Sequence, residues 1–154
     1  MSRDLSRLAR TSRICAILVV AGGLSLSASA EPPVEGCPFA VECYYRARWG
    51  QADEFIRLYR KNHLPVLKKS MEKGRILKLS AVTPRYHATG ESRWDYRVTI
   101  VFKDAIVAHD PSVEEEIKKQ LFTDQETFKE EEQKRFEILE AHWDVPVEGL
   151  ALDE

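Results

Sequence analysis

Residues 93–103 read RWDYRVTIVFK, and the alternation within this stretch decides the predicted fold. One face of an extended chain would carry Trp94, Tyr96, Val98, Ile100 and Phe102. The other face would carry Arg93, Asp95, Arg97, Thr99 and Val101. A period of two residues, rich in aromatic and β-branched side chains, predicts a β-strand that is buried on one face only.

Three further segments predict strands around this one. Residues 75–83 (RILKLSAVT) precede it, and the connection 84–92, with Gly90 at its turn, predicts a hairpin. Residues 43–49 (CYYRARW) alternate in the same way. Residues 142–147 (HWDVPV) form a shorter stretch, in which Pro146 indicates an edge strand or a strand end.

Apolar residues at helical spacing follow Gln51, and Pro65 interrupts them. Proline lacks the backbone N–H that a helix interior needs, so we expect a break near 62–63 and a second short helix up to Gly74. A later helix is predicted to start with Ser112 as its cap and Glu115 completing a capping box. A longer helix to about residue 140 should bury Phe128, Phe136 and Leu139.

The predicted order is therefore β-α-β-β-α-β, the α+β, ferredoxin-like arrangement with an antiparallel sheet and its helices on one face. The uncovered face would be mixed, with Tyr44, Arg46, Arg48, Asp95, Arg97, Thr99 and Val101. Such a face is typical of a sheet that packs against a second copy, so we expect a homodimer, its charges paired or holding an anion. The alternative is exposed charge on a monomer, which contributes little to stability.

The N-terminus predicts export. Residues 1–30 place four arginines before an apolar run that ends in Ala28-Ser29-Ala30, the layout of a cleavable signal peptide. A retained anchor is the alternative, but a membrane span needs roughly 20 strongly apolar residues. We therefore expect a periplasmic or secreted protein without a stable membrane anchor. An arm (31–42), one α+β domain (43–147) and a flexible tail (148–154) would follow.

Charge and cysteine usage narrow the possible partners. The 154-residue chain has a formal net charge of −2, which argues against nucleic acid as a partner because that binding depends on basic patches. Cys37 and Cys43 would lie in an oxidising compartment and are predicted to form a disulfide that fastens the arm to the first strand. A redox or metal-binding pair is the alternative, although no C-x-x-C motif is present.

The four histidines show none of the spacings of a metal site, so no metal is expected. His63 and His87 are the candidate general bases. His63 could instead bind carbonyl groups freed by the helix break. Asp95 with Arg93 or Arg97 is interpreted as an ion pair rather than an acid/base couple. The two candidate bases would share a ligand pocket with Tyr45, Tyr86, Trp94, Tyr96 and His142.

Residues 42–147 resemble the dimeric α+β barrel superfamily, which includes NIPSNAP-like, EthD-like and antibiotic-biosynthesis-monooxygenase-like families. The resemblance lies in a strand ending Arg48-Trp49-Gly50, then Ala52-Asp53-Glu54-Phe55-Ile56 and Tyr59, then Leu64-Pro65-Val66-Leu67, then another strand. It implies sheets paired back to back and a pocket between sheet and helices. Some members oxidise or isomerise small molecules, and some bind haem.

The expected function is therefore an exported, dimeric protein that binds or modifies a small, mostly apolar molecule. Catalysis would be cofactor-independent oxygenation or isomerisation, with His63 or His87 as the base. One alternative is a non-enzymatic interaction or structural domain whose use lies in dimerisation. A second alternative is haem binding through one histidine.

Overall fold

A computed structural model of the chain describes residues 36–86 and 88–149. The predicted signal peptide, residues 31–35 of the arm, His87 and residues 150–154 of the tail lie outside the described residues. None of the helices in the described residues is long and apolar enough to cross a membrane.

Four strands form one antiparallel sheet in the order β2-β3-β1-β4. Their bounds are Phe39–Ala47 (β1), Ile76–Val82 (β2), Tyr96–Phe102 (β3) and Leu139–Val147 (β4). The predicted fold class, a ferredoxin-like β-α-β-β-α-β domain, is confirmed. β4 is an edge strand, so Pro146 lies where a missing backbone donor is tolerated, as predicted.

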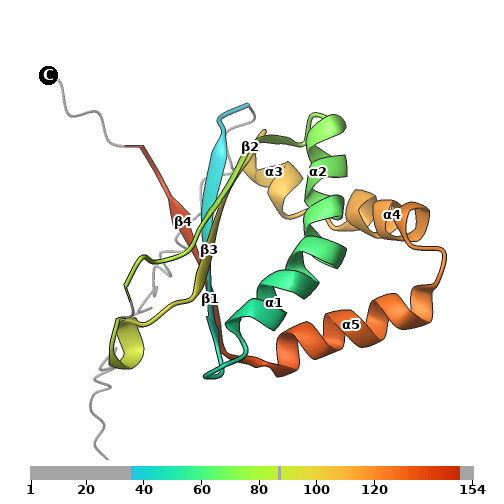
Figure 1. Cartoon of the computed structure of the whole chain (residues 1–154). Coiled ribbons are helices and arrows are strands. Elements are labelled where there is room, and N and C mark those ends of the chain that lie inside the picture. Colours follow the sequence, from blue (N-terminus) through green and yellow to red (C-terminus); the bar gives the residue numbers. More distant parts are fainter. Residues whose placement is uncertain (1–35, 87, 150–154) are drawn as a thin grey trace, which may run out of the picture. The chain divides into compact units, whose positions relative to one another are not determined.

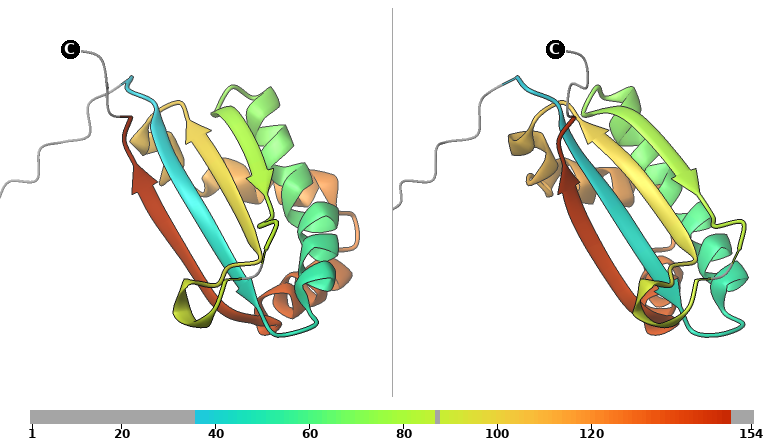
Figure 2. Two further views of the ribbon diagram at one scale, coloured as in Figure 1. Left: turned by 60° about the vertical axis from the view of Figure 1, so that its left-hand side comes forward. Right: turned by 90° about the vertical axis from the view of Figure 1, so that its left-hand side faces the viewer.

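Within the described residues, all helices except one short 3₁₀ turn lie on one face of the sheet, and they leave the other face open (Figures 1 and 2). They are α1 (Ala52–Leu58), η1 (Tyr59–His63), α2 (Leu64–Glu72), α3 (Ala105–Ala108), α4 (Ser112–Leu121) and α5 (Gln125–Glu137). A short 3₁₀ turn, η2 (Gly90–Ser92), lies between β2 and β3. The core contains the helix-facing residues of the central strands, among them Tyr45, Tyr96 and Val98, packed against Phe55 and Leu58.

The alternation predicted for 93–103 holds only from Tyr96 onward. Trp94 precedes β3, and its ring packs edge-on against Tyr44, 5.9 Å between centroids, on the uncovered face. The predicted placement of Trp94 beside Tyr96 is therefore wrong. The cause is Asp95, whose backbone N–H donates to the Tyr45 carbonyl while its carboxylate accepts from the Ala47 N–H, so the strand pattern stops there.

β1 begins at Phe39, inside the predicted arm, because Phe39 pairs with Phe102 of β3. Cys43 consequently lies in the middle of a strand and is buried, whereas Cys37 is exposed, and both are free thiols. The predicted pairing of Cys37 with Cys43 is therefore wrong, because Cys43 is held inside β1 and both thiols are free.

The predicted helix break at 62–63 is a wide turn rather than an interruption. Residues 59–63 form a π-helix, in which the Leu64 N–H donates to the carbonyl of Tyr59, five residues earlier. Pro65 follows directly in the first turn of α2, and the wide turn before it accommodates a residue that has no backbone N–H. The helical stretch therefore continues from α1 through η1 into α2 without a loop.

The segment between β3 and α5 departs most from the prediction. An unpredicted helix, α3, starts where the Asp104 carboxylate accepts from the Val107 N–H. Ser112 is the first residue of α4 rather than its cap, and its N–H donates to Asp110 Oδ1 at 3.0 Å, so the predicted capping box is wrong. In α5, Phe128 is buried as predicted, but Phe136 is 52% exposed.

Candidate ligand site

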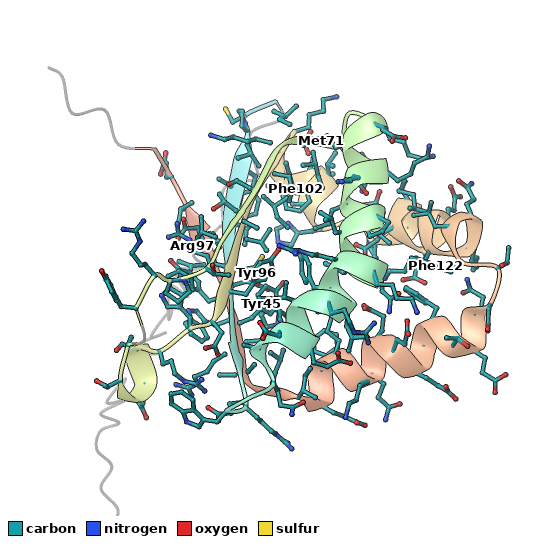
Figure 3. The ribbon with its side chains drawn as sticks, in the orientation of Figure 1. Tyr45, Met71, Tyr96, Arg97, Phe102 and Phe122 are labelled. Carbon is teal, nitrogen blue, oxygen red and sulfur yellow. The ribbon has the colours of Figure 1, made fainter. Side chains whose placement is uncertain are left out.

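An aromatic cluster lies at the centre of the helix-covered face. Tyr45 and Tyr96 point from β1 and β3 toward the helices (Figure 3), where they meet Phe55 of α1 and Tyr59 of η1. Ring centroids within the cluster are 4.9 to 6.2 Å apart, the spacing of favourable tilted and edge-on aromatic pairs. The cluster fills the space between the central strands and the helical stretch α1–η1.

The Tyr59 hydroxyl is a polar group inside this apolar cluster. Tyr59 is 1% exposed, and its hydroxyl lies near the Tyr45 hydroxyl without forming a well-aligned hydrogen bond to any described residue. Burial raises the pKa of the phenol above its usual range, and the neighbouring Tyr45 adds to the effect. The group therefore stays neutral, and it is a polar atom in the core whose bonding capacity is unused.

His142 of β4 stacks on Tyr45, with the ring planes nearly parallel and the centroids 4.4 Å apart. Its Nε2 lies 3.1 Å from Oδ1 of Asp144, two residues along the same strand. Asp144 is directly opposite Cys43 in the β1–β4 ladder. Burial, with the Asp144 carboxylate adding to it, raises the pKa of the Cys43 thiol above its usual range. The thiol is consequently a weak nucleophile.

His63 lies at the end of the π-turn, its ring 5.0 Å from that of Tyr59. Its Nδ1 is 4.0 Å from Glu132, which accepts two hydrogen bonds from the buried Arg135 at 2.9 and 2.8 Å. Burial, reinforced by the Arg135 charge, lowers the pKa of His63 from 6.5 to about 4. The imidazole is therefore neutral near pH 7, and it is a weaker base than an ordinary histidine.

An apolar pocket of about 310 Å³, which we call the β1 pocket, opens on one side of the aromatic cluster. It lies between the sheet and α3 and is lined by Phe39, Val41, Cys43, Ile100, Phe102, Ala108, His109, Asp144 and Pro146. Its walls are apolar, and its polar groups are a thiol, an imidazole and a carboxylate. His109 Nδ1 is 2.7 Å from the Ala105 carbonyl, and its ring lies 5.5 Å from Phe39.

A second pocket of about 280 Å³, the β2 pocket, lies on the other side of the cluster. It is lined by Tyr59, Arg60, Leu64, Lys68, Leu79, Ser80, Ala81, Tyr96 and Val98. The helical stretch η1–α2 forms one wall and strands β2 and β3 form the other. The two pockets share no lining residue.

The structure brings together some of the predicted pocket residues and separates others. Tyr45, Tyr96 and His142 lie on the helix-covered face, and His63 contacts the same aromatic cluster through Tyr59. Tyr86 is 81% exposed in the β2–β3 connection. Trp94 lies on the opposite face, and His87 is outside the described residues. Tyr86 and Trp94 therefore do not join the pocket that was predicted beside the connection 84–92.

The stretch around Arg93 holds the sheet end together. The Arg93 guanidinium bonds Asp95 at 3.2 and 3.3 Å, the Ala47 carbonyl at 2.7 Å and Glu140 at 2.8 Å. It also lies over the Trp49 ring, 4.3 Å from the centroid. Arg93 and Asp95 thus form the ion pair preferred from the sequence, and they connect the ends of β1, β3 and β4.

The uncovered face of the sheet carries its own aromatic group. Tyr44 stacks on Trp143, 5.3 Å between centroids, and Trp94 packs against the edge of Tyr44. Arg97 points to this side (Figure 3), and its guanidinium lies 5.8 and 5.6 Å from the Tyr44 and Trp94 rings. Its Nε is buried and has no partner among the described residues.

No residue of the β1 pocket was predicted as a pocket residue from the sequence, including its polar members Cys43, His109 and Asp144. His109 follows a helix whose start could have been recognised, because Asp104 is a favourable cap residue before Ala-Ile-Val. The juxtaposition of Cys43 and Asp144 depends on the β1–β4 register, for which the sequence has no local signal. Within the described residues, no group of three or more His, Cys, Asp or Glu could hold a metal ion.

No protein-family model matches this chain, and no curated protein matches it in sequence. Solved structures are similar to it at low identity. A dimeric ferredoxin-like protein from an uncultured marine organism has TM-score 0.49 and 9% identity, covering 78% of this chain and 95% of that one. SnoaB, a cofactor-independent oxygenase from Streptomyces nogalater, has TM-score 0.45 and 8% identity, covering 76% and 98%. A NIPSNAP family protein from Agrobacterium tumefaciens has TM-score 0.43 and 12% identity, covering 77% and 90%.

Proposed function

We propose that the protein binds a small, mostly apolar molecule in the β1 pocket. The observation that carries this proposal is the composition of the pocket, whose apolar walls enclose only a few polar groups. Its volume of about 310 Å³ is at the lower end of the range for small-molecule sites. Phe39, Phe102 and Ile100 would contact the ligand body, while His109 and Asp144 would orient a polar substituent.

The geometry favours binding over general-base catalysis by His63. That side chain lines neither pocket, and its pKa near 4 makes it a poor proton acceptor at neutral pH. The protonated Cys43 thiol is likewise a weak nucleophile. We therefore propose binding as the function and attach no reaction to it.

A variant that fills the pocket tests the proposal. Ala108→Phe places a ring in the β1 pocket from α3, while Ile106→Phe adds a ring to the same helix at a residue that is 51% exposed and outside the pocket. Bicyclic quinones and phenols should raise the melting temperature of the wild type and of Ile106→Phe, but not of Ala108→Phe. The proposal is wrong if no compound stabilises the wild type, or if Ala108→Phe, folded by circular dichroism, binds as well as the control.

We also propose that a second copy of the chain covers the open face of the sheet. The support is the group formed by Tyr44, Trp94 and Trp143 around Arg97, because tryptophan, tyrosine and arginine dominate binding energy at protein interfaces. The exposed valines of the edge strands, including Val145 and Val147, extend the apolar area.

Light scattering on purified protein tests the dimer. Trp143→Ala should weaken association by at least about 30-fold if Trp143 is an interface hot spot. Leu121→Ala, which removes an exposed apolar side chain from the helix layer, is the matched control and should leave the mass unchanged. A wild-type mass equal to that of one copy at tens of micromolar would refute the dimer.

Export remains part of the proposal, supported by the four arginines and the apolar run before Ala30. Mass spectrometry of protein produced with residues 1–30 present should show a chain that begins at Glu31 in the exported fraction. An intact N-terminus, with all protein retained inside the cell, would refute export.

A further inference from the structure

The β2 pocket combines an apolar interior with two cations that have no acidic partner. Arg60 and Lys68 both line it, and neither forms an ion pair with any other described residue. We propose that the β2 pocket is a second binding site, specific for an amphiphilic monoanion: an alkyl chain that carries one carboxylate.

Within residues 52–72, Arg60 and Lys68 are the lysine and arginine side chains that have no ion pair with a described residue. Three neighbouring cations on the same helical stretch are each paired with an acid: Arg57 with Glu54, Lys61 with Glu131 and Lys69 with Glu72. The chain as a whole carries a net negative charge of −2. The β2 pocket therefore carries two positive charges that no acid of the described residues pairs with.

A further donor lies at the same place. The Tyr96 hydroxyl makes no hydrogen bond to another described residue, and Arg60 is close enough to act on it electrostatically. Burial raises the pKa of Tyr96, and the Arg60 charge partly opposes that rise. A carboxylate at the mouth would accept from the Tyr96 hydroxyl and from Arg60, and it would lie near the Lys68 ammonium.

The interior suits a hydrocarbon chain. Val98 and Tyr96 form a buried floor, and Leu64 and Leu79 form half-buried walls on opposite sides. A volume of about 280 Å³ suits a single short chain. A neutral apolar ligand would leave the two cations unused, and a polyanion would leave the apolar floor exposed.

This site is independent of the ligand proposed for the β1 pocket, because the two pockets share no residue. The experiment is a titration of the full chain with octanoate, followed by two-dimensional amide NMR, with 1-octanol as the neutral counterpart. Shift changes should concentrate at residues 60–68 and 79–81. Octanoate should bind more tightly than 1-octanol, and decanoate should bind roughly tenfold or more tightly than octanoate, since each buried methylene contributes about fourfold.

Variants separate the charges from the fold. Arg60→Gln combined with Lys68→Gln should weaken octanoate binding by roughly tenfold and leave 1-octanol unchanged. Arg48→Gln combined with Lys73→Gln removes the same charge from exposed residues outside the pocket and should change octanoate affinity less than twofold. The proposal is overturned if octanol binds as tightly as octanoate, if both double variants weaken binding equally, or if the shift changes occur at residues 39–43 and 100–109.

Discussion

Removing the Tyr59 hydroxyl should stabilise the protein, against the usual outcome of a substitution in the core. Tyr59 is 1% exposed, and its hydroxyl lies near the Tyr45 hydroxyl without forming a well-aligned hydrogen bond to any described residue. A buried polar group without a partner costs about 1–3 kcal/mol relative to its exposure in the unfolded chain. Tyr59→Phe keeps the ring and its contacts with Tyr45, Phe55 and Tyr96, so most of this cost should be recovered.

Urea unfolding at pH 7, monitored by circular dichroism, measures the effect. The free energy of unfolding should rise by about 1–3 kcal/mol, with a melting temperature higher by roughly 4 °C for each kcal/mol. The control is Tyr44→Phe, which removes a hydroxyl that donates to Glu42 and should cost about 0.5–1.5 kcal/mol. A loss of stability in Tyr59→Phe equal to that of the control would refute the reasoning, since the hydroxyl would then have a partner in solution.

The remaining predictions concern charge, thiol reactivity and one buried network. Because the pKa of His63 is lowered from 6.5 to about 4, the unfolded chain binds a proton that the folded chain rejects, so stability should fall by about 2 kcal/mol from pH 7 to pH 5. His63→Gln should lose this part of the dependence in urea unfolding at the two pH values, and an unchanged dependence would contradict the assignment. Arg93→Met should cost about 3 kcal/mol in the same assay, because Asp95, at the sheet end, loses its partner; a loss below 1 kcal/mol would show that the network is not important for stability. In a maleimide time course followed by mass spectrometry, Cys37 should react at once and Cys43 only on unfolding, because one is exposed and the other buried; a chain with no reactive thiol under native conditions would contradict the free Cys37.

The fold could be predicted because its signals are local. Val98 and Ile100 alternate with Arg97 and Thr99, and that period is enough to define a half-buried strand. Pro65 marks the irregularity in the first helical layer, although the sequence does not distinguish a break from a wide turn. Four strands and two helical layers in this order leave few arrangements open.

The candidate site was harder to predict because strand register and local interruptions of the strand pattern decide which of its residues come together. Trp94 continues the alternation of β3 in sequence, but the strand begins only at Tyr96. The hydrogen bonds of Asp95 to β1 interrupt the pattern, and the Trp94 ring lies on the other face. The sequence placed Cys43 at the start of the first strand, where a short disulfide loop was plausible. The strand in fact begins at Phe39, because Phe39 pairs with Phe102, far along the chain. Local pattern thus defines the elements, and long-range pairing defines which side chains meet.

The π-turn at residues 59–63 has a consequence for aligning this chain with other proteins of the same topology. Each residue of an α-helix turns the chain by about 100°, so deleting one residue here would swing Val66 and Leu67 away from the interior. The number of residues at this point is therefore constrained, although Pro65, its signal in the sequence, does not distinguish a π-turn from a break. A homologue with an ordinary helix would be one residue shorter here, and an ungapped alignment to it would misassign every helical position from Leu64 onward.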